Sequence, residues 1–141
     1  MREIIFRGLN KLGKWEYGDL VHNTINSANQ VIEVGIKSPR CYAVEVIPET
    51  VGQYTGLKDK NGNMIFEGDI VRLYQFYYED EPEENVFTDH TVVYGDKYDY
   101  PAFDLDPSTG AESNNLQDGI LGDYEGLEII GNVHEVKNEN D

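Results

Sequence analysis

The chain has 141 residues, a net charge of −16 and 39% hydrophobic residues. This apolar content supports a modest folded core and excludes a chain that is disordered throughout. No run approaches the ~20 apolar residues that span a bilayer, and the first seven residues lack the apolar stretch of a signal peptide. The single Cys41 excludes a disulfide framework and a multi-cysteine zinc site. We therefore expect a soluble, cytoplasmic protein with no membrane partner.

The negative charge is concentrated in the second part of the chain. Residues 1–78 contain nine basic and nine acidic residues, whereas residues 79–141 contain two lysines and 18 acidic residues. Because the second part would repel phosphate groups, direct binding to nucleic acid or to an anionic membrane is not expected. A neutral part followed by an anionic part describes the chain better than uniform acidity does.

The N-terminal residues predict a β-hairpin. Polar and apolar residues alternate over 2–9, a turn-like tetrad follows at 10–13, and the alternation resumes at 14–17. Residues 19–30 are polar and rich in asparagine, so they are predicted to form a loop.

Two further strands are predicted before the middle of the chain. They cover residues 31–34 and 41–47, and Pro48 ends the second. Cys41 lies in this alternating segment, where we expect it to be a small buried side chain rather than a nucleophile.

The clearest local pattern lies between residues 55 and 73. The Asn61-Gly62 pair favours a type I′ turn, in which both central residues have positive φ. A strand at 64–66, a tight corner at 67–69 and a strand at 70–74 follow, which is a common arrangement in small β-barrels.

The anionic part predicts short strands separated by loops. Residues 79–85 form an acidic loop, strands are expected at 91–94 and 102–105, and residues 106–115 have the composition of a loop. A closing strand is predicted at 127–136, with Gly131 as a bulge or bend.

No segment shows a sustained helical period. The predicted class is therefore all-β with few or no helices: a small N-terminal β-hairpin region packed with an SH3-like β-barrel or roll. We divide the chain into an N-terminal β region (1–47), a barrel with acidic loops (48–136) and a frayed tail (137–141).

Four segments of the chain together carry a family resemblance. Residues 48–62 (PETVGQYTGLKDKNG) and 65–71 (IFEGDIV) resemble the signature of the YopX family, a group of small bacteriophage and prophage proteins. Residues 5–9 (IFRGL) are similar to the family's start, with Gly-Leu in place of the more usual Ala-Trp, and 129–135 (IIGNVHE) are similar to its ending. The resemblance implies an all-β fold with an SH3-like barrel and a phage or prophage origin. It implies no activity, and residues 79–123 are the least family-like.

The signature has a structural and a functional interpretation. Its glycines mark places where a Cβ would be costly, and its Asp and Asn side chains can bond their own backbone in turns, which favours a mostly structural role. The polar members Gln53, Tyr54, Thr55 and Glu67 instead suggest partner binding. The full set is Gly52, Gln53, Tyr54, Thr55, Gly56, Leu57, Asp59, Gly62, Glu67, Gly68, Asp69, Gly131 and Asn132.

An aromatic run at Tyr74, Phe76, Tyr77 and Tyr78 is a candidate interface. It is interpreted first as a core strand and otherwise as an interface strand, because a small chain cannot easily bury both faces. Stacking of single-stranded nucleic acid on these rings is disfavoured by the acidic residues that follow.

Candidate chemistry is sparse. The three histidines, His22, His90 and His134, lack a metal-ligand spacing, although a zinc site assembled in space stays open. Asp104-Leu105-Asp106 resembles a phosphatase motif only superficially and lacks the βαβ context, and the same segment fails as a calcium loop. Weak divalent-cation binding by the acidic part is a further alternative. No catalytic residue, cofactor or metal ligand is assigned.

Two classes of function follow. The first is a non-enzymatic phage or prophage accessory protein that acts as a structural or interaction module in the bacterial cytoplasm, forming a homo-oligomer or docking on a host or phage protein. The second is an acidic nucleic-acid mimic that inhibits a host DNA-handling protein by occupying its basic groove.

Overall fold

The computed structural model describes residues 3–39, 41–75, 87–95, 102–106, 116–117 and 124–135. Within them, regular structure consists of β-strands, one 3₁₀ turn (η1, Pro48–Thr50) and two helical residues at 116–117. The predicted all-β class is confirmed. The chain forms two compact units, Met1–Gly56 and Leu57–Asp141.

The division between the units falls within β5 (Gly52–Lys58). The boundary expected from the sequence lies earlier, immediately before Pro48. The segmentation into 1–47, 48–136 and 137–141 stays a prediction.

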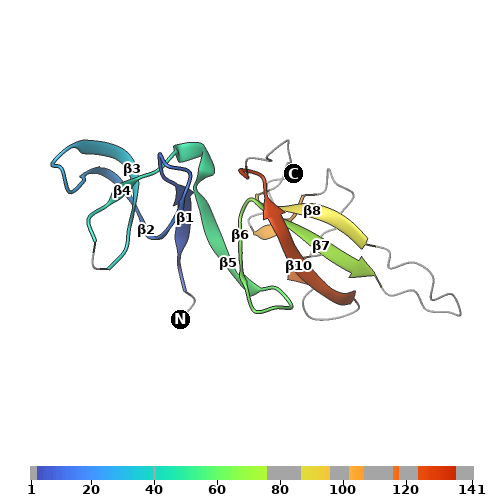
Figure 1. Ribbon diagram of the computed structural model, residues 1–141. Helices are drawn as coiled ribbons and strands as arrows, with labels where there is room; N and C mark the ends of the chain where they lie inside the picture. Colours follow the sequence, from blue (N-terminus) through green and yellow to red (C-terminus); the bar gives the residue numbers. More distant parts are fainter. Residues whose placement is uncertain are drawn as a thin grey trace, which may run out of the picture. The chain divides into compact units, whose positions relative to one another are not determined.

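An antiparallel sheet forms the first unit, with strand order β4-β3-β2-β1-β5 (Figure 1). β1 and β2 pair from Phe6 opposite Gly18 to Leu9 opposite Trp15, which confirms the predicted N-terminal hairpin. The buried apolar side chains here include Ile32, Ile36, Ala43 and Val46. The strands are β1 (Phe6–Leu9), β2 (Trp15–Ile25), β3 (Val31–Lys37), β4 (Val44–Glu45) and the start of β5.

The loop predicted at 19–30 is wrong over most of its length. β2 continues to Ile25 and pairs with β3 from Asp19 opposite Lys37 to Ile25 opposite Val31. His22 and Asn23 are exposed, so these polar residues remain solvated within the strand. Pairing with β3 overrides their weak strand propensity, which composition alone could not reveal.

The strand predicted at 41–47 is also shorter than expected. β4 contains only Val44 and Glu45, because the preceding residues form a bend in which the Cys41 N–H donates to the Ser38 carbonyl at 3.2 Å. Cys41 is exposed, so its expected burial is wrong.

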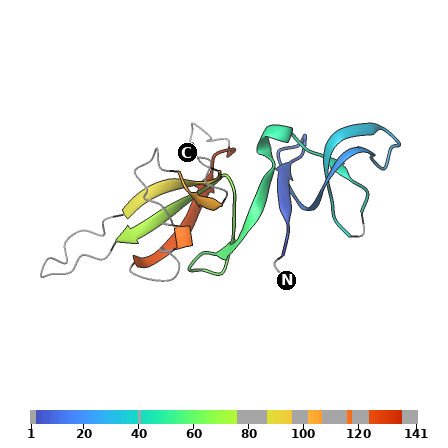
Figure 2. The ribbon, with the colours of Figure 1, turned by 180° about the vertical axis from the view of Figure 1, so that it is seen from behind.

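A four-stranded antiparallel sheet with order β10-β7-β8-β9 forms most of the second unit (Figures 1 and 2). Among the described strands the sheets remain open, so the SH3-like barrel is not observed as a closed barrel. The four strands of this sheet are β7 (Asp69–Gln75), β8 (Phe87–Tyr94), β9 (Phe103–Leu105) and β10 (Tyr124–Asn132). The second unit also contains β6 (Met64–Phe66), which belongs to the other sheet, where it lies next to β5.

One apolar cluster fills the interior of the second unit. Val71 and Leu73, two positions apart on β7, point into this cluster, and Val92 joins it from β8. A partly buried Leu57, Phe103 and Ile129 pack against it. Its buried members are Ile65, Val71, Leu73, Val92, Leu105, Leu116 and Leu127.

Three hairpins of this chain share one turn design. The turn begins at Asn10, Asn26 or Asp59, and in each case the side-chain Oδ1 accepts the N–H groups two and four residues later. The fourth residue of each turn adopts positive φ: +77° at Gly13, +60° at Asn29 and +84° at Gly62. These features describe a three-residue hairpin loop closed by a glycine-type bulge.

The type I′ turn predicted at Asn61-Gly62 is therefore wrong in type, although a turn is present. Of this pair only Gly62 has positive φ. The Asp59 side chain holds the N–H groups of Asn61 and Asn63, each at 2.9 Å, which stabilises the longer loop.

The remaining strand predictions vary in outcome. The strand at 64–66, the corner at 67–69 and the bulge at Gly131 are confirmed, the last by a register shift between Ile129 and Gly131. β8 begins at Phe87, earlier than expected. The predicted acidic loop at 79–85 and the tail at 137–141 lie outside the described residues.

Candidate functional site

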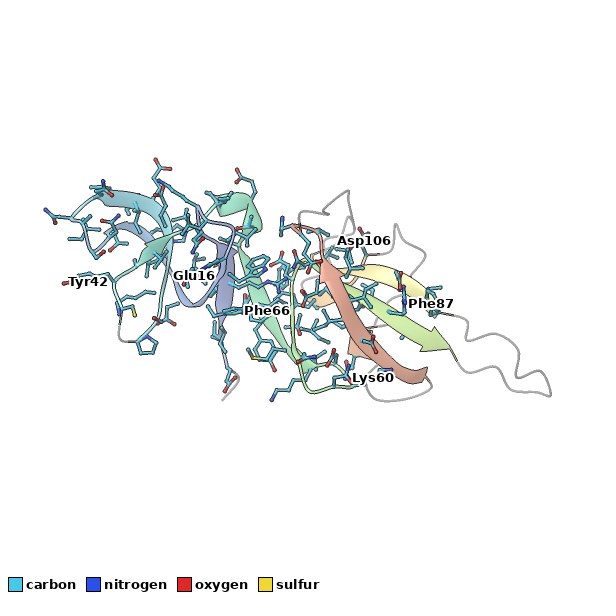
Figure 3. The ribbon with its side chains drawn as sticks, viewed as in Figure 1. Glu16, Tyr42, Lys60, Phe66, Phe87 and Asp106 are labelled. Carbon is cyan, nitrogen blue, oxygen red and sulfur yellow. The ribbon has the colours of Figure 1, made fainter. Side chains whose placement is uncertain are left out.

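The Asp59 turn is joined to β10 by its side chain and its backbone. Asp59 Oδ2 accepts the N–H of Ile129 at 3.1 Å, and the N–H of Lys60 donates to the carbonyl of Leu127 at 3.0 Å. Lys60 Nζ also lies 3.2 Å from Glu128 Oε2, at the place labelled in Figure 3. The turn thus satisfies backbone groups along the outer edge of β10.

Burial and hydrogen bonding act in opposite directions on the Asp59 carboxyl, which is 6% exposed. Burial alone would raise its pKa, but the N–H groups of Ile129, Asn63 and Asn61 favour the charged form. They hold the pKa of Asp59 below its ordinary value of 3.8. Asp59 is therefore a buried carboxylate whose acceptor capacity is used within the fold.

The corner between β6 and β7 uses a second buried carboxylate. Asp69 Oδ2 accepts the N–H of Phe66 at 2.7 Å, and Asp69 is 2% exposed. Gly68, with φ of +91°, donates to the Val92 carbonyl at 2.8 Å and accepts from the Val133 N–H at 2.9 Å. The corner is thereby fixed to β8 on one side and to the end of β10 on the other.

The end of β10 supplies the matching half of this corner. Asn132 pairs with Asp69 in the sheet register, and its Oδ1 accepts the N–H of His134 at 2.9 Å. A Cβ on Gly131 would lie only 2.9 Å from Glu135 Oε2, so glycine leaves room for that carboxylate. Signature residues from the middle and the end of the sequence therefore meet in one corner.

The signature residues of β5 are divided between its faces. Gly52 and Gln53 pair with Arg7 and Phe6 of β1, and the Tyr54 N–H donates to the Ile5 carbonyl at 2.8 Å. Tyr54 is 6% exposed, so most of its side chain packs within the first unit.

The other polar members are less enclosed. Gln53, Thr55 and Glu67 are half-buried, and Gly56 is exposed with φ of +87°. Alternation along β5 explains the difference from Tyr54, because the strand's side chains point to opposite faces. Whether the polar members bind a partner stays a prediction.

Comparison with protein families gives a match to the YopX protein family over residues 5–138. The chain belongs to the YopX family. A comparison with curated protein sequences finds no match. Among solved structures, this YopX chain is similar to protein EF1440 from Enterococcus faecalis, with a TM-score of 0.53 and 24% identity over 96% of each chain. That likeness concerns the fold.

The aromatic run of this YopX protein is described only at its first member. Tyr74 lies on β7, opposite Phe87 of β8 and Gly126 of β10. Phe76, Tyr77 and Tyr78 lie outside the described residues, so the interface interpretation stays a prediction.

Charged side chains of the second unit form a row across its sheet. Arg72 Nε and Nη2 bind the two carboxylate oxygens of Asp89 at 2.8 and 3.1 Å, and the guanidinium lies 3.8 Å above the ring of Phe87 (Figure 3). Glu128 lies opposite Arg72 on β10 and pairs with Lys60. The described cations of this row are thus matched by carboxylates, which disfavours phosphate binding there.

The three histidines have different surroundings. His90 is 4% exposed, and its Nε2 lies 2.7 Å from Thr88 Oγ1. Burial lowers its pKa below the ordinary 6.5, and the charge of Asp89 offsets this in part. His22 is exposed on β2, and His134 is half-buried beyond β10.

The described ranges offer neither clustered metal ligands nor a membrane-spanning helix. They contain no group of three or more His, Cys, Asp or Glu side chains that could hold a metal ion. None of the helices among them is long and apolar enough to cross a bilayer. The Asp104 carboxylate, singled out from the sequence, instead accepts the N–H groups of Leu105 and Leu116 at 2.9 and 3.2 Å.

The sequence does not reveal one surface, because residues 19–30, which include Ile25, are predicted to form a loop and the strand at 31–34 is given no partner there. Ile25 and Val31 pair directly across β2 and β3 and are 47% and 77% exposed. The run of uncharged residues around them was a usable signal: residues 20–32 contain no Asp, Glu, Lys or Arg.

Proposed function

We propose that this YopX-family chain is a non-enzymatic phage or prophage accessory protein that acts as a structural module and self-associates in the cytoplasm of its bacterial host. The observation that carries the proposal is the separation of charge between its two units. Met1–Gly56 contains six basic and six acidic residues, whereas Leu57–Asp141 contains five basic and 21 acidic residues.

The neutral unit also exposes apolar side chains. Contacts between copies through this unit would bury apolar area on a surface without net charge, which favours association. Its exposed large apolar residues within the described ranges are Ile4, Leu12, Tyr17, Ile25, Val31, Tyr42 and Ile47.

The use of the buried carboxylates supports a non-enzymatic role. Asp59, Asp69 and Asp104 are each less than 10% exposed, and each accepts backbone N–H groups. Carboxylates engaged in this way stabilise turns and strand ends, and they are poorly placed to exchange protons with a substrate.

Light scattering coupled to size-exclusion chromatography tests the proposal. We expect a mass at least twice the 16.0 kDa of one chain. The association should strengthen from low to moderate salt, because salt screens repulsion between the anionic units. A mass of one chain at all salt concentrations would overturn the proposal.

Nucleic-acid mimicry is the second candidate, favoured by the excess of acidic residues in Leu57–Asp141. A mimic would bind a basic groove, and salt would weaken that binding. Capture from host lysate at low and high salt separates the candidates. Salt-sensitive recovery of DNA-handling proteins supports mimicry, and a recovered set without such proteins opposes it.

A further inference from the structure

We propose that a second copy of this chain docks on the turn end of the β2–β3 hairpin, a surface formed by Ile25, the turn at 26–30 and Val31. We call this the hairpin tip. The proposal rests on the self-association proposed above and names the surface that carries it.

The hairpin tip exposes an aliphatic pair that the first unit leaves uncovered. Ile25 and Val31 are register partners and are 47% and 77% exposed. The next residue of β3, Ile32, is 2% exposed, so the strand buries one face and presents the other to solvent. β-Branched residues paired across two strands form a compact apolar surface.

The turn that joins this pair is held firmly by one side chain. Asn26 Oδ1 accepts the N–H groups of Ala28 and Gln30, each at 3.0 Å, and Asn26 Nδ2 donates to Gln30 Oε1 at 3.1 Å. The backbone adds bonds from Asn26 N to the Gln30 carbonyl and from Asn29 N to the Asn26 carbonyl. A surface ordered before binding loses less conformational entropy when a partner docks.

The absence of charged residues at the hairpin tip limits which molecules can dock there. Residues 20–32 carry no Asp, Glu, Lys or Arg, although 27% of the chain is charged. A strongly charged partner would find no counter-charge here. The hairpin tip itself would place no like charges face to face, with Glu33 the next exposed residue on that face of β3, whereas copies meeting through Leu57–Asp141 would oppose 21 acidic residues to 21.

The polar groups of the hairpin tip also suit contact with themselves. Beyond the groups that hold the turn, Asn29 carries an amide donor and acceptor and Gln30 carries its Nε2 donor, so one surface can bond an identical surface turned by a two-fold rotation. An aliphatic pair flanked by amides is therefore self-complementary. The occupant is accordingly a second copy of this chain.

The test compares two exposed aliphatic residues next to similar turns. Val31→Glu changes the hairpin tip, and Leu12→Glu, at a residue 82% exposed in the turn that begins at Asn10, is the matched control. Sedimentation velocity should show association weakened at least tenfold by Val31→Glu and within twofold of the wild type for Leu12→Glu. Fluorescence of Trp15, the single tryptophan, reports folding of the first unit in each variant.

The outcomes separate this inference from the proposed function. If the wild type is oligomeric and Val31→Glu associates equally well, docking at the hairpin tip is ruled out, while self-association itself is retained. A monomeric wild type would overturn both. If Val31→Glu alters the Trp15 melt, Val31→Thr is used, which keeps the β-branch and should weaken association about threefold.

Hydrogen exchange on the unmodified protein gives a second readout. Peptides that cover residues 24–32 should gain protection as the protein concentration rises through the association range. Protection that rises elsewhere and stays constant over 24–32 would contradict the inference.

Discussion

Asp59 and Ile129 are 70 residues apart in sequence and are joined by a hydrogen bond of 3.1 Å from the Ile129 N–H to Asp59 Oδ2. The same carboxylate holds its own turn through Asn61 and Asn63. One side chain thus connects the middle of the YopX signature to the strand that carries its ending.

Replacing Asp59 with alanine should destabilise the second unit by about 3 kcal/mol, because three N–H groups lose a charged acceptor near a buried site. Chemical denaturation followed by hydrogen exchange of residues 57–135 measures the change. Asn10→Ala removes the same turn contacts at a half-buried residue, together with a bond to Glu16, but water can replace the exposed turn bonds, so it should cost about 1 kcal/mol. Equal losses for the two variants would show that the link to β10 contributes little.

The acid limb of the stability curve should also depend on Asp59. Its pKa in the folded state lies below its ordinary value of 3.8, so its stabilising effect is present above that pH and is lost as the pH falls through the folded-state pKa. The wild type should therefore have a higher free energy of unfolding than Asp59→Asn at pH 7, and the difference between the two proteins should become smaller below pH 4. A gap that stays constant from pH 7 to pH 3 would rule out this linkage.

The shared turn design predicts opposite effects at two equivalent positions. Gly62→Ala should cost about 1–2 kcal/mol, since φ is +84° and the new Cβ would meet no atom within 4 Å. Asn29→Gly, at φ of +60°, should be neutral or stabilising by less than about 1 kcal/mol. Trp15 fluorescence follows the first unit and hydrogen exchange follows the second. If Gly62→Ala leaves the stability of the second unit unchanged, the turn must relax so that residue 62 adopts a negative φ.

His90 should make the second unit less stable as the pH falls from 7 toward 5. Burial lowers its folded-state pKa below the ordinary 6.5, so the unfolded chain binds the proton more readily in this window. His90→Gln should flatten the pH dependence between 7 and 5 while keeping a polar group near Thr88. The same change at exposed His22 is the control, and a slope unaltered by His90→Gln would contradict the assignment.

Local turn chemistry made much of the fold predictable. Asn10, Gly62, Gly68 and Gly131 mark turns, a corner and a bulge that the structure contains, because these features depend on one or two residues. The length of β2 was not predictable in this way. Its polar residues become a strand only through pairing with β3, which is a tertiary effect.

The candidate site shows the same limit. The sequence indicates that Asp59 and Asp69 belong to turns, but their acceptor bonds to distant or buried N–H groups require the folded sheet. The exposure of Val31 was hidden by assigning the neighbouring residues to a loop. An uncharged run in an acidic chain was the usable clue.

Self-association of this chain through its neutral first unit can be measured on the unmodified protein, from its mass by sedimentation at low and moderate salt over a range of concentrations. We expect a mass of at least two chains, with an oligomer that forms more readily as salt screens the anionic unit. A mass of 16.0 kDa at every concentration and salt level would show that the chain does not self-associate.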